Sequence, residues 1–305
     1  MRKKLIGIAV VAAALVLALG VLAGCGSSSS SSAASASGSA SASESASASA
    51  SGDAVYRTLD EIKDSGKIVI GVFSDKNPFG YVDENGEYAG YDIELANRLA
   101  EDLGVEVEFV STEAANRVEY LETGKVDVIL ANFTVTDERA QKVDFCDPYM
   151  NVALGVVSHN DKVITDLSEI GADDEIIVIT GTTAETYLTE NNPEIKLKKF
   201  ETYANAKTAF ENKEGVAWAN DNTEVIAFAN GAEGYTVGIE ELGSLDTIAP
   251  AVSKGNTELL EWINEDMKKL GAENFFHAAY EKTLLEVYGA DYEDILVVEP
   301  GQQAK

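Results

Sequence analysis

The chain has 305 residues and carries 23 Lys and Arg against 52 Asp and Glu, for a formal net charge of −29. Because neutralising phosphates requires clustered Lys and Arg, this balance argues against a nucleic-acid partner. Two cysteines cannot build a disulfide scaffold and two separated histidines offer little for a zinc site, so we predict neither a metal nor a cofactor. The length allows one or two domains with a sizeable core.

The first 24 residues have the features of an export signal. Met1–Lys4 is basic, Leu5–Val21 is an unbroken apolar run, and Leu22–Cys25 reads Leu-Ala-Gly-Cys. The run is nearly long enough for a transmembrane helix, but small residues before a cut point favour a signal peptide. Leu-Ala-Gly-Cys resembles the bacterial lipobox, which implies cleavage before Cys25 and a diacylglycerol on its thiol. We therefore predict a signal peptide over residues 1–24 and a protein that is lipid-anchored at the extracytoplasmic face of a bacterial cell membrane.

The next segment is predicted to be a disordered tether. Gly26–Gly52 contains 15 Ser and 8 Ala and a single charged residue, Glu44. Such a composition has nothing to bury, so it cannot offset the entropy of ordering. A partly helical Ala/Ser segment is the alternative, but no apolar stripe supports it. Residues 25–52 are therefore expected to be the lipidated cysteine and its tether, and the fold to start at residue 53.

The folded part opens with alternating strand and helix patterns. β-branched apolar runs predict strands, and apolar residues at helical spacing predict helices. Asn85-Gly86 between short aromatic-bearing arms predicts a hairpin turn. Asp92 is expected to cap a helix that stops at Gly104. In chain order we expect strands over 67–73, 105–110 and 126–131, and helices over 92–103 and 116–122.

The same alternation restarts after residue 158 and ends in helices. Thr247–Ser253 is apolar and extended, and its Pro250 is typical of an edge strand or a crossing segment. Strands separated by helices predict mostly parallel sheets, here two α/β lobes around a ligand cleft. We expect strands over 175–179, 195–200 and 216–219, and helices over 182–190, 203–210 (capped by Thr202), 223–230, 259–270 and 275–285.

Three loops at strand ends carry the candidate chemistry. In the first, Thr136 can cap a helix that places Arg139 one turn in, where a guanidinium could hold a carboxylate bidentately. The second, Thr180–Thr183, joins a strand to a helix and offers hydroxyl and N–H groups to an anion. The third places Asp221 after a buried strand, where an acid can receive an ammonium. A structural role stays open for each, namely an ion pair for Arg139 and helix capping for the other two.

These loops together match a zwitterion with a carboxylate and an ammonium, and their sequences resemble a known family. From about residue 57 to about 298, the chain is similar to the polar amino-acid solute-binding proteins of bacterial ABC importers (family 3). The motifs that carry the resemblance are Asn132–Arg139, Val143–Phe145, Pro148-Tyr149, Gly86–Asp92 and Gly124–Asp127. Within the family the chain resembles the cysteine-binding branch, through Gly71–Asp83, Glu113–Glu119, Asp144–Met150 and Ile248–Val252.

The resemblance implies a two-lobed, type II periplasmic-binding-protein fold of class α/β. Each lobe is expected to be a mixed or parallel sheet flanked by helices, with crossing hinge strands near Leu154–Val157 and Thr247–Ala251. Lobe 1 is expected over 53–156 and 249–305, and lobe 2 over 157–248. The resemblance also implies a monomer that binds an amino acid and delivers it to the permease subunits of an ABC transporter.

The resemblance assigns the ends of the ligand to particular residues. Arg139 would bind the α-carboxylate, helped by Thr134 and by the Thr182-Thr183 turn. Asp221 would take the α-ammonium, with the backbone of Asn132 nearby.

The pocket for the ligand side chain departs from the glutamine and histidine binders of the family. Arg117 matches a position that is basic in some binders of acidic amino acids, and Phe79 is carried over as a ligand-binding position. The predicted ligand is L-cysteine, with cystine, glutamate or aspartate as alternatives. The positions at which the chain differs from the glutamine and histidine binders are Phe73, Lys76, Ala114 and Asn220.

An enzyme is the competing hypothesis. A secreted dehydratase of the cyclohexadienyl type has the same fold and acids lie near the predicted cleft, but the chain has no Ser/His/Asp set. His159 and His277 fall outside the motif loops and are expected to be surface or packing residues, and Cys146 to be a buried packing residue. We therefore predict a binding protein with no catalytic residue. A surface adhesin or antigen that merely keeps the fold is the third hypothesis.

Overall fold

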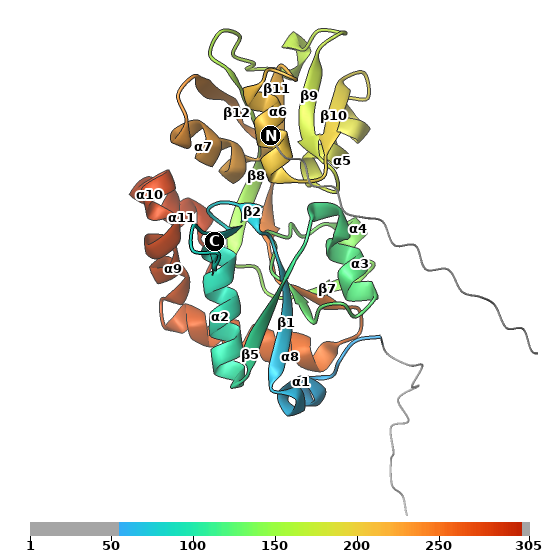
Figure 1. The fold of residues 1–305 in the computed structure, drawn as a ribbon, viewed down its shortest axis with the longest axis vertical. Helices are drawn as coiled ribbons and strands as arrows, with labels where there is room; N and C mark the ends of the chain where they lie inside the picture. The colour runs from blue at the N-terminus through green and yellow to red at the C-terminus, as the bar shows by residue number, and fades with distance from the viewer. Residues whose placement is uncertain (1–54, 301–305) are drawn as a thin grey trace, which may run out of the picture. The chain divides into compact units, whose positions relative to one another are not determined.

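The computed structural model describes residues 55–300, which form two α/β lobes joined by extended strands (Figure 1). This is the two-lobed architecture predicted from the sequence. The predicted signal peptide, Cys25 and the predicted tether lie outside the described residues. Among residues 55–300, no helix is long and apolar enough to cross a membrane.

The sheet of lobe 1 has five strands in the order β5-β1-β6-β13-β7. β1 pairs in parallel with β5 and β6, whereas β13 is antiparallel to β6 and β7. Because β13 comes from far down the chain, it returns the C-terminal part to the sheet of lobe 1. The bounds are β1 Lys67–Val72, β5 Glu106–Ser111, β6 Val128–Ile129, β7 Val143–Phe145 and β13 Ala251–Ser253.

Helices cover both faces of this sheet. α2 packs on β1 and β5, and α3 contacts β6, β7 and β13 on the other side in Figure 1. α2 ends at Gly104, whose left-handed backbone (φ +75°) forms the predicted C-cap. Asp92 is not the predicted N-cap, because α2 begins one residue earlier and the N-cap position falls on Gly90. The bounds are α1 Leu59–Ser65, α2 Tyr91–Leu103, η1 Ala114–Asn116, α3 Arg117–Glu122, α4 Asp137–Ala140, α8 Thr257–Ala272, α9 Phe275–Thr283, α10 Leu285–Tyr288, η3 Ala290–Tyr292 and α11 Glu293–Leu296.

Asp92 instead fixes the loop after β6 by accepting two hydrogen bonds. Tyr149 Oη donates to Oδ1 at 2.6 Å, and the backbone N–H of Asn132 donates to Oδ2 at 2.8 Å. Asp92→Ala leaves both buried donors unpaired, so we expect urea titrations to show a free energy of unfolding lower by about 2–4 kcal/mol.

Asp92→Asn is the matched control for this variant. Burial disfavours the charge of Asp92 and raises its pKa to about 6, and an amide keeps one acceptor oxygen for the two donors, so asparagine should cost less than alanine. Equal losses for the two variants would mean that these hydrogen bonds do not carry the effect.

A small antiparallel sheet, β2-β3-β4, extends lobe 1 toward lobe 2. The predicted turn at Asn85-Gly86 joins β3 and β4, with Gly86 at φ +86°. β2 contacts α6 (Tyr203–Glu211) of lobe 2, so residues of β2 lie where the lobes meet. The bounds are β2 Asp75–Lys76, β3 Gly80–Val82 and β4 Tyr88–Ala89.

The sheet of lobe 2 has the order β10-β9-β11-β8-β12. β9 is parallel to β10 and β11, whereas β8 is antiparallel to β11 and β12. The predicted helix cap at Thr202 is confirmed, because its side chain accepts the N–H of Asn205. The bounds are β8 Met150–His159, η2 Leu167–Glu169, β9 Glu175–Ile179, α5 Thr183–Asn191, β10 Lys196–Phe200, α6 Tyr203–Glu211, β11 Ala217–Asp221, α7 Asn222–Gly231 and β12 Tyr235–Ile248.

β8 and the end of β12 carry the chain between the lobes. The first crossing lies earlier than predicted, because Leu154–Val157 already pair with β11 in the second sheet. The predicted lobe boundary after residue 156 therefore falls inside β8. The second crossing agrees with the prediction, since β12 ends at Ile248, β13 begins at Ala251, and the Pro250 carbonyl between them accepts the N–H of Cys146 at 2.8 Å.

Candidate functional site

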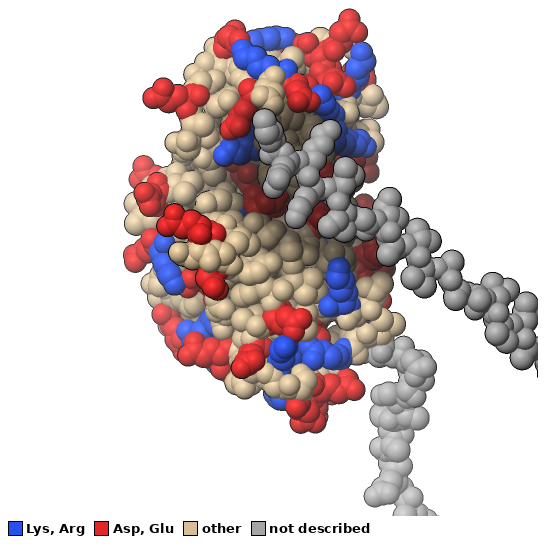
Figure 2. Space-filling model, in the orientation of Figure 1, with Lys and Arg blue, Asp and Glu red and all other residues tan. Residues whose placement is uncertain are grey.

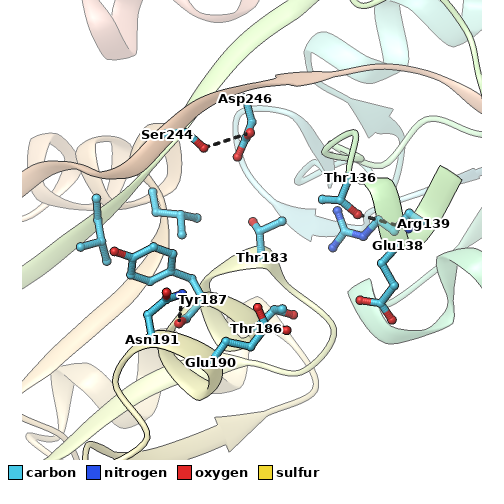
Figure 3. Close-up of a pocket in the computed structure, with 12 residues that line it drawn as sticks. Thr136, Glu138, Arg139, Thr183, Thr186, Tyr187, Glu190, Asn191, Ser244 and Asp246 are labelled. Carbon is cyan, nitrogen blue, oxygen red and sulfur yellow. Dashed lines mark hydrogen bonds between the residues drawn. The ribbon is translucent and has the colours of Figure 1, made fainter.

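Two of the three strand-end loops, those of Arg139 and Thr183, meet at a cavity of about 310 Å³ between the two lobes (Figure 3). Arg139 borders this cavity from lobe 1 and Thr183 borders it from lobe 2. The predicted cation and the predicted anion-binding turn therefore face one space. Polar side chains from β12, Ser244 and Asp246, lie on its far side.

Arg139 combines a fixed position with free hydrogen-bond donors. The Thr136 hydroxyl accepts its backbone N–H at 3.2 Å, which confirms the predicted helix cap. Its Nη1 donates to the Thr134 carbonyl at 2.7 Å and its Nη2 to the Gly181 carbonyl at 3.0 Å. A guanidinium has five donors, so three are without a partner within residues 55–300. Burial and the neighbouring charge of Arg117 lower the pKa of Arg139, and a ligand anion would offset both effects.

Arg117 is also buried, but nearly all of its donors are used. Four hydrogen bonds of 3.0–3.1 Å hold its guanidinium to backbone carbonyls of both lobes, which leaves one donor. Arg117 therefore positions the loops around the cavity, in contrast to Arg139. The four acceptors are the carbonyls of Ala114, Ala131, Asn132 and Gly181.

The two threonines at the start of α5 have different roles, because one caps the helix and the other faces the cavity. The Thr182 hydroxyl donates to the Ile179 carbonyl at 2.7 Å and accepts the N–H of Glu185 at 3.3 Å. It is thus a helix cap, which is the alternative role left open for this loop. Thr183 begins the helix and its side chain faces the cavity (Figure 3). The start of a nine-residue helix also favours an anion there.

Asp221 is the last residue of β11 and is already paired with a cation. Lys76 Nζ of lobe 1 donates to its Oδ2 at 2.7 Å, across the gap between the lobes. Burial opposes the charged form of Lys76, but the charge of Asp221 raises its pKa above the usual value. The other oxygen of Asp221 accepts no hydrogen bond within the described part of the chain, so it can still receive an ammonium. Sequence reasoning missed this partner, although Lys76 stood out as a departure from the glutamine and histidine binders.

Asn132 and Thr134 lie on the loop between β6 and α4, and both are buried. The backbone of Asn132 is committed to the protein, because its N–H bonds Asp92 and its carbonyl accepts from Arg117. The backbone of Asn132 is therefore not free for a ligand, whereas the Oδ1 and Nδ2 of its side chain have no partner within residues 55–300. Buried polar atoms are seldom left unpaired, so a ligand or water is expected there. Thr134 places its carbonyl on Arg139.

Phe79 is fully buried and lies against Lys76. Its ring centroid is 5.6 Å from Lys76 Nζ and 6.4 Å from the ring of Tyr288. Phe79 therefore packs against the lysine that pairs with Asp221.

The two lobes are in contact around the site. The Tyr288 hydroxyl donates to the Thr223 carbonyl at 2.8 Å, and Asp75 Oδ2 accepts the N–H of Ala204 at 3.1 Å. Together with the bonds to Gly181 and the Lys76–Asp221 pair, these contacts describe a closed arrangement, in which groups from both lobes can enclose a small molecule.

The residues set aside as structural lie in packing or surface positions. His159 packs on the ring of Phe210 at 4.5 Å, and His277 pairs with Glu293 and Glu299. Cys146 is buried in the core of lobe 1, and burial raises the pKa of its thiol, as a packing role predicts. Within residues 55–300, no cluster of three His, Cys, Asp or Glu side chains could hold a metal ion.

The acidity of the chain is distributed over the surface. On the face drawn in Figure 2, acidic side chains outline both lobes and basic ones are interspersed among them. Such a surface favours solubility, and it exerts little net force on a zwitterion.

The profile of the bacterial extracellular solute-binding proteins, family 3, matches residues 68–286. The ABC transporter glutamine-binding protein GlnH of Bacillus subtilis (strain 168) is 32% identical over 236 residues, which are 75% of this chain and 85% of that protein.

Two solved structures resemble this chain in both sequence and fold. The solute receptor for L-cysteine of Neisseria gonorrhoeae is 50% identical with a TM-score of 0.78, covering 80% of this chain and 100% of that one. The cysteine-binding protein of Campylobacter jejuni is 49% identical with a TM-score of 0.77, covering 79% of this chain and 98% of that one.

Proposed function

The chain belongs to the bacterial extracellular solute-binding proteins of family 3, and on that premise we propose that it captures L-cysteine and delivers it to the permease of an ABC importer. One observation carries the proposal: Arg139 of one lobe keeps free donors, Asp221 of the other keeps a free carboxylate oxygen, and the two side chains are near enough for their charges to interact. The relatives described as binding cysteine, at 50% and 49% identity, support this ligand over the other polar amino acids.

In the proposed complex each end of the ligand meets a group of opposite charge. The α-carboxylate takes the free donors of Arg139, with Thr134 and the start of α5 at Thr183 beside it. The α-ammonium takes the free oxygen of Asp221, near the unpartnered amide of Asn132.

Other residues of the proposed site hold the ligand-contacting residues in position. Arg117 and Thr182 hold the loops in place, and Phe79 supports Lys76 beside Asp221. Each of these groups has a role in binding the ligand or in positioning a neighbour, and none is assigned a role in breaking a covalent bond. We therefore propose binding without catalysis.

Binding can be tight although the ligand is small. Cysteine has about seven non-hydrogen atoms, and a ceiling of about 1.5 kcal/mol per atom allows a Kd of tens of nanomolar. That limit is approached only when both charged ends are paired and removed from water, which closure of the lobes over Arg139 and Asp221 would achieve.

Isothermal titration calorimetry under reducing conditions tests the ligand. Saturable heat with L-cysteine is expected, and a thermal-shift panel should show a stabilisation of about 2.7 kcal/mol at 100 times the Kd. Saturable heat with glutamate, aspartate or cystine, but none with cysteine, would move the ligand to one of those alternatives. Failure of every amino acid would favour an adhesin that keeps the fold. Turnover of prephenate or arogenate would make the protein an enzyme.

We also propose that Cys25 carries the lipid that holds the protein at the extracytoplasmic face of the membrane, beyond a tether over residues 26–52. A radiolabelled fatty acid fed to expressing bacteria should label the wild type and not Cys25→Ala, and the variant should leave the membrane fraction. Equal labelling of the two would contradict the proposal. Cys146→Ala is the control, since this buried thiol should not affect labelling.

A further inference from the structure

A second ammonium group lies beside the proposed ligand site, and it belongs to the protein. The Lys76 side chain is 0% exposed, and its Nζ is 2.7 Å from Asp221 Oδ2. Removing a cation so completely from water is unfavourable unless its surroundings are built to receive it.

Lys76 is surrounded by a cage of three aromatic rings. The distances from Nζ to the ring centroids are 4.8 Å for Tyr203, 5.6 Å for Phe79 and 5.8 Å for Phe73. All lie within the range of cation–π attraction, which is strongest for desolvated cations. Tyr203 belongs to lobe 2 and the other two rings to lobe 1, so the cage is complete only when the lobes are together.

A second carboxyl group, that of Glu224, lies near enough for its charge to interact with this ion pair. Glu224 lies one turn after Asp221 on α7, is 7% exposed, and its Oε2 has no partner within residues 55–300. Its charge interacts with those of Lys76 and Asp221, and burial raises its pKa to about 7. The ammonium is thus paired with Asp221 and acts on Glu224 only through its charge. Without Lys76, the rings and acids would form a site that attracts a cation.

We propose that Lys76 determines the specificity of the amino-acid site, by filling with the protein's own ammonium the aromatic and acidic cage in which a cationic ligand side chain would otherwise bind. This inference rests on the proposed function. A ligand side chain that ends in a cation meets like charge and an occupied cage, so arginine and lysine are rejected. A short neutral side chain leaves the pair of Lys76 and Asp221 in place.

Lys76→Ala tests the cage directly, because it removes three carbon atoms and an ammonium, which n-propylammonium can replace. Saturating n-propylammonium is expected to raise the Tm of Lys76→Ala by roughly 5 °C or more and to leave that of the wild type unchanged. Lys76→Met fills the cage with a neutral chain, so it should not respond. Lys207→Ala is the matched control, because Lys207 lies 5.7 Å from the ring of Phe228 but is exposed.

Calorimetry with amino acids tests the consequence for specificity. The wild type should bind L-arginine and L-lysine far more weakly than L-cysteine, and Lys76→Ala should bind one of the two cationic amino acids about tenfold or more tightly than the wild type does. Wild-type binding of arginine as tight as that of cysteine would overturn the inference. So would n-propylammonium responses that are equal in Lys76→Ala, Lys76→Met and the wild type.

The outcomes separate this inference from the proposed function. If Lys76→Ala responds to n-propylammonium while the wild type binds no amino acid, the cage is supported and the proposed function fails. If the wild type binds L-cysteine and Lys76→Ala gains no cation, the function stands and the inference fails. A Lys76→Ala chain that folds only with n-propylammonium also supports the cage, and one that stays unfolded with it contradicts the cage.

Discussion

Arg139→Ala is expected to weaken L-cysteine binding by about 100-fold or more, because it removes one partner of a buried charge pair with the ligand carboxylate. The Tm of the ligand-free protein should change little. Only the Thr134 carbonyl loses its donor beside the cavity, since the Gly181 carbonyl keeps its bond from Arg117. Calorimetry gives the Kd and thermal unfolding gives the Tm.

Three further arginine variants separate a loss of ligand contact from a loss of charge or of structure. Arg139→Lys keeps the charge but loses the planar fork, so it should recover only part of the affinity. Arg98→Ala should leave the Kd unchanged, because Arg98 pairs with Asp102 and Glu273 on the surface. Arg117→Ala should lower the Tm of the ligand-free protein, since three carbonyls lose their donor and the Gly181 carbonyl keeps only its bond from Arg139.

The opposite pattern would reassign Arg139. A Kd within about threefold of the wild type, together with a large loss of Tm, would place it with Arg117 as a residue that holds the loops. The ligand carboxylate would then have to rely on the start of α5 at Thr183.

Features that depend on a few neighbouring residues could be predicted from the sequence. Thr136 and Thr202 cap their helices through the N–H group three residues on, so the pattern contains the whole interaction. The turn at Gly86 is local in the same way. β12 was not predicted, because its glycines, its acids and its many exposed positions lack the apolar alternation of a buried strand.

Features that join distant parts of the chain could not be predicted in this way. Lys76 and Asp221 are separated by 145 positions, and neither sequence context reveals the other. Asp92 has the residue type of a helix cap, yet tertiary contacts with Tyr149 and Asn132 determine its role. The loops that carry the candidate site could therefore be predicted from their sequences. Which of their side chains are hydrogen-bonded to other protein groups, and which keep free donors or acceptors, could not.

Gly181→Ala should weaken L-cysteine binding by roughly 10- to 100-fold, because it destabilises only the arrangement in which the two lobes are closed. A Cβ on Gly181 would lie 2.5 Å from Ala115 Cα and 2.7 Å from its backbone nitrogen, across the gap between the lobes. These atoms are backbone, so relief requires the lobes to separate, at a cost of about 1–3 kcal/mol for such overpacking. Separation would also lengthen the bonds from Arg117 and Arg139 to the Gly181 carbonyl.

Gly86→Ala is the control that isolates closure from backbone strain. Gly181 and Gly86 have similar left-handed backbones, with φ of +80° and +86°, so alanine costs about the same there, roughly 1–2 kcal/mol. Nothing lies within 4 Å of a Cβ on Gly86, so that variant should lose Tm and keep its Kd. Small-angle scattering should then show ligand-induced compaction in Gly86→Ala and less of it in Gly181→Ala. Equal Kd values for the two would mean that binding does not require Gly181 to approach Ala115, and that the lobes hold the ligand in a more open arrangement.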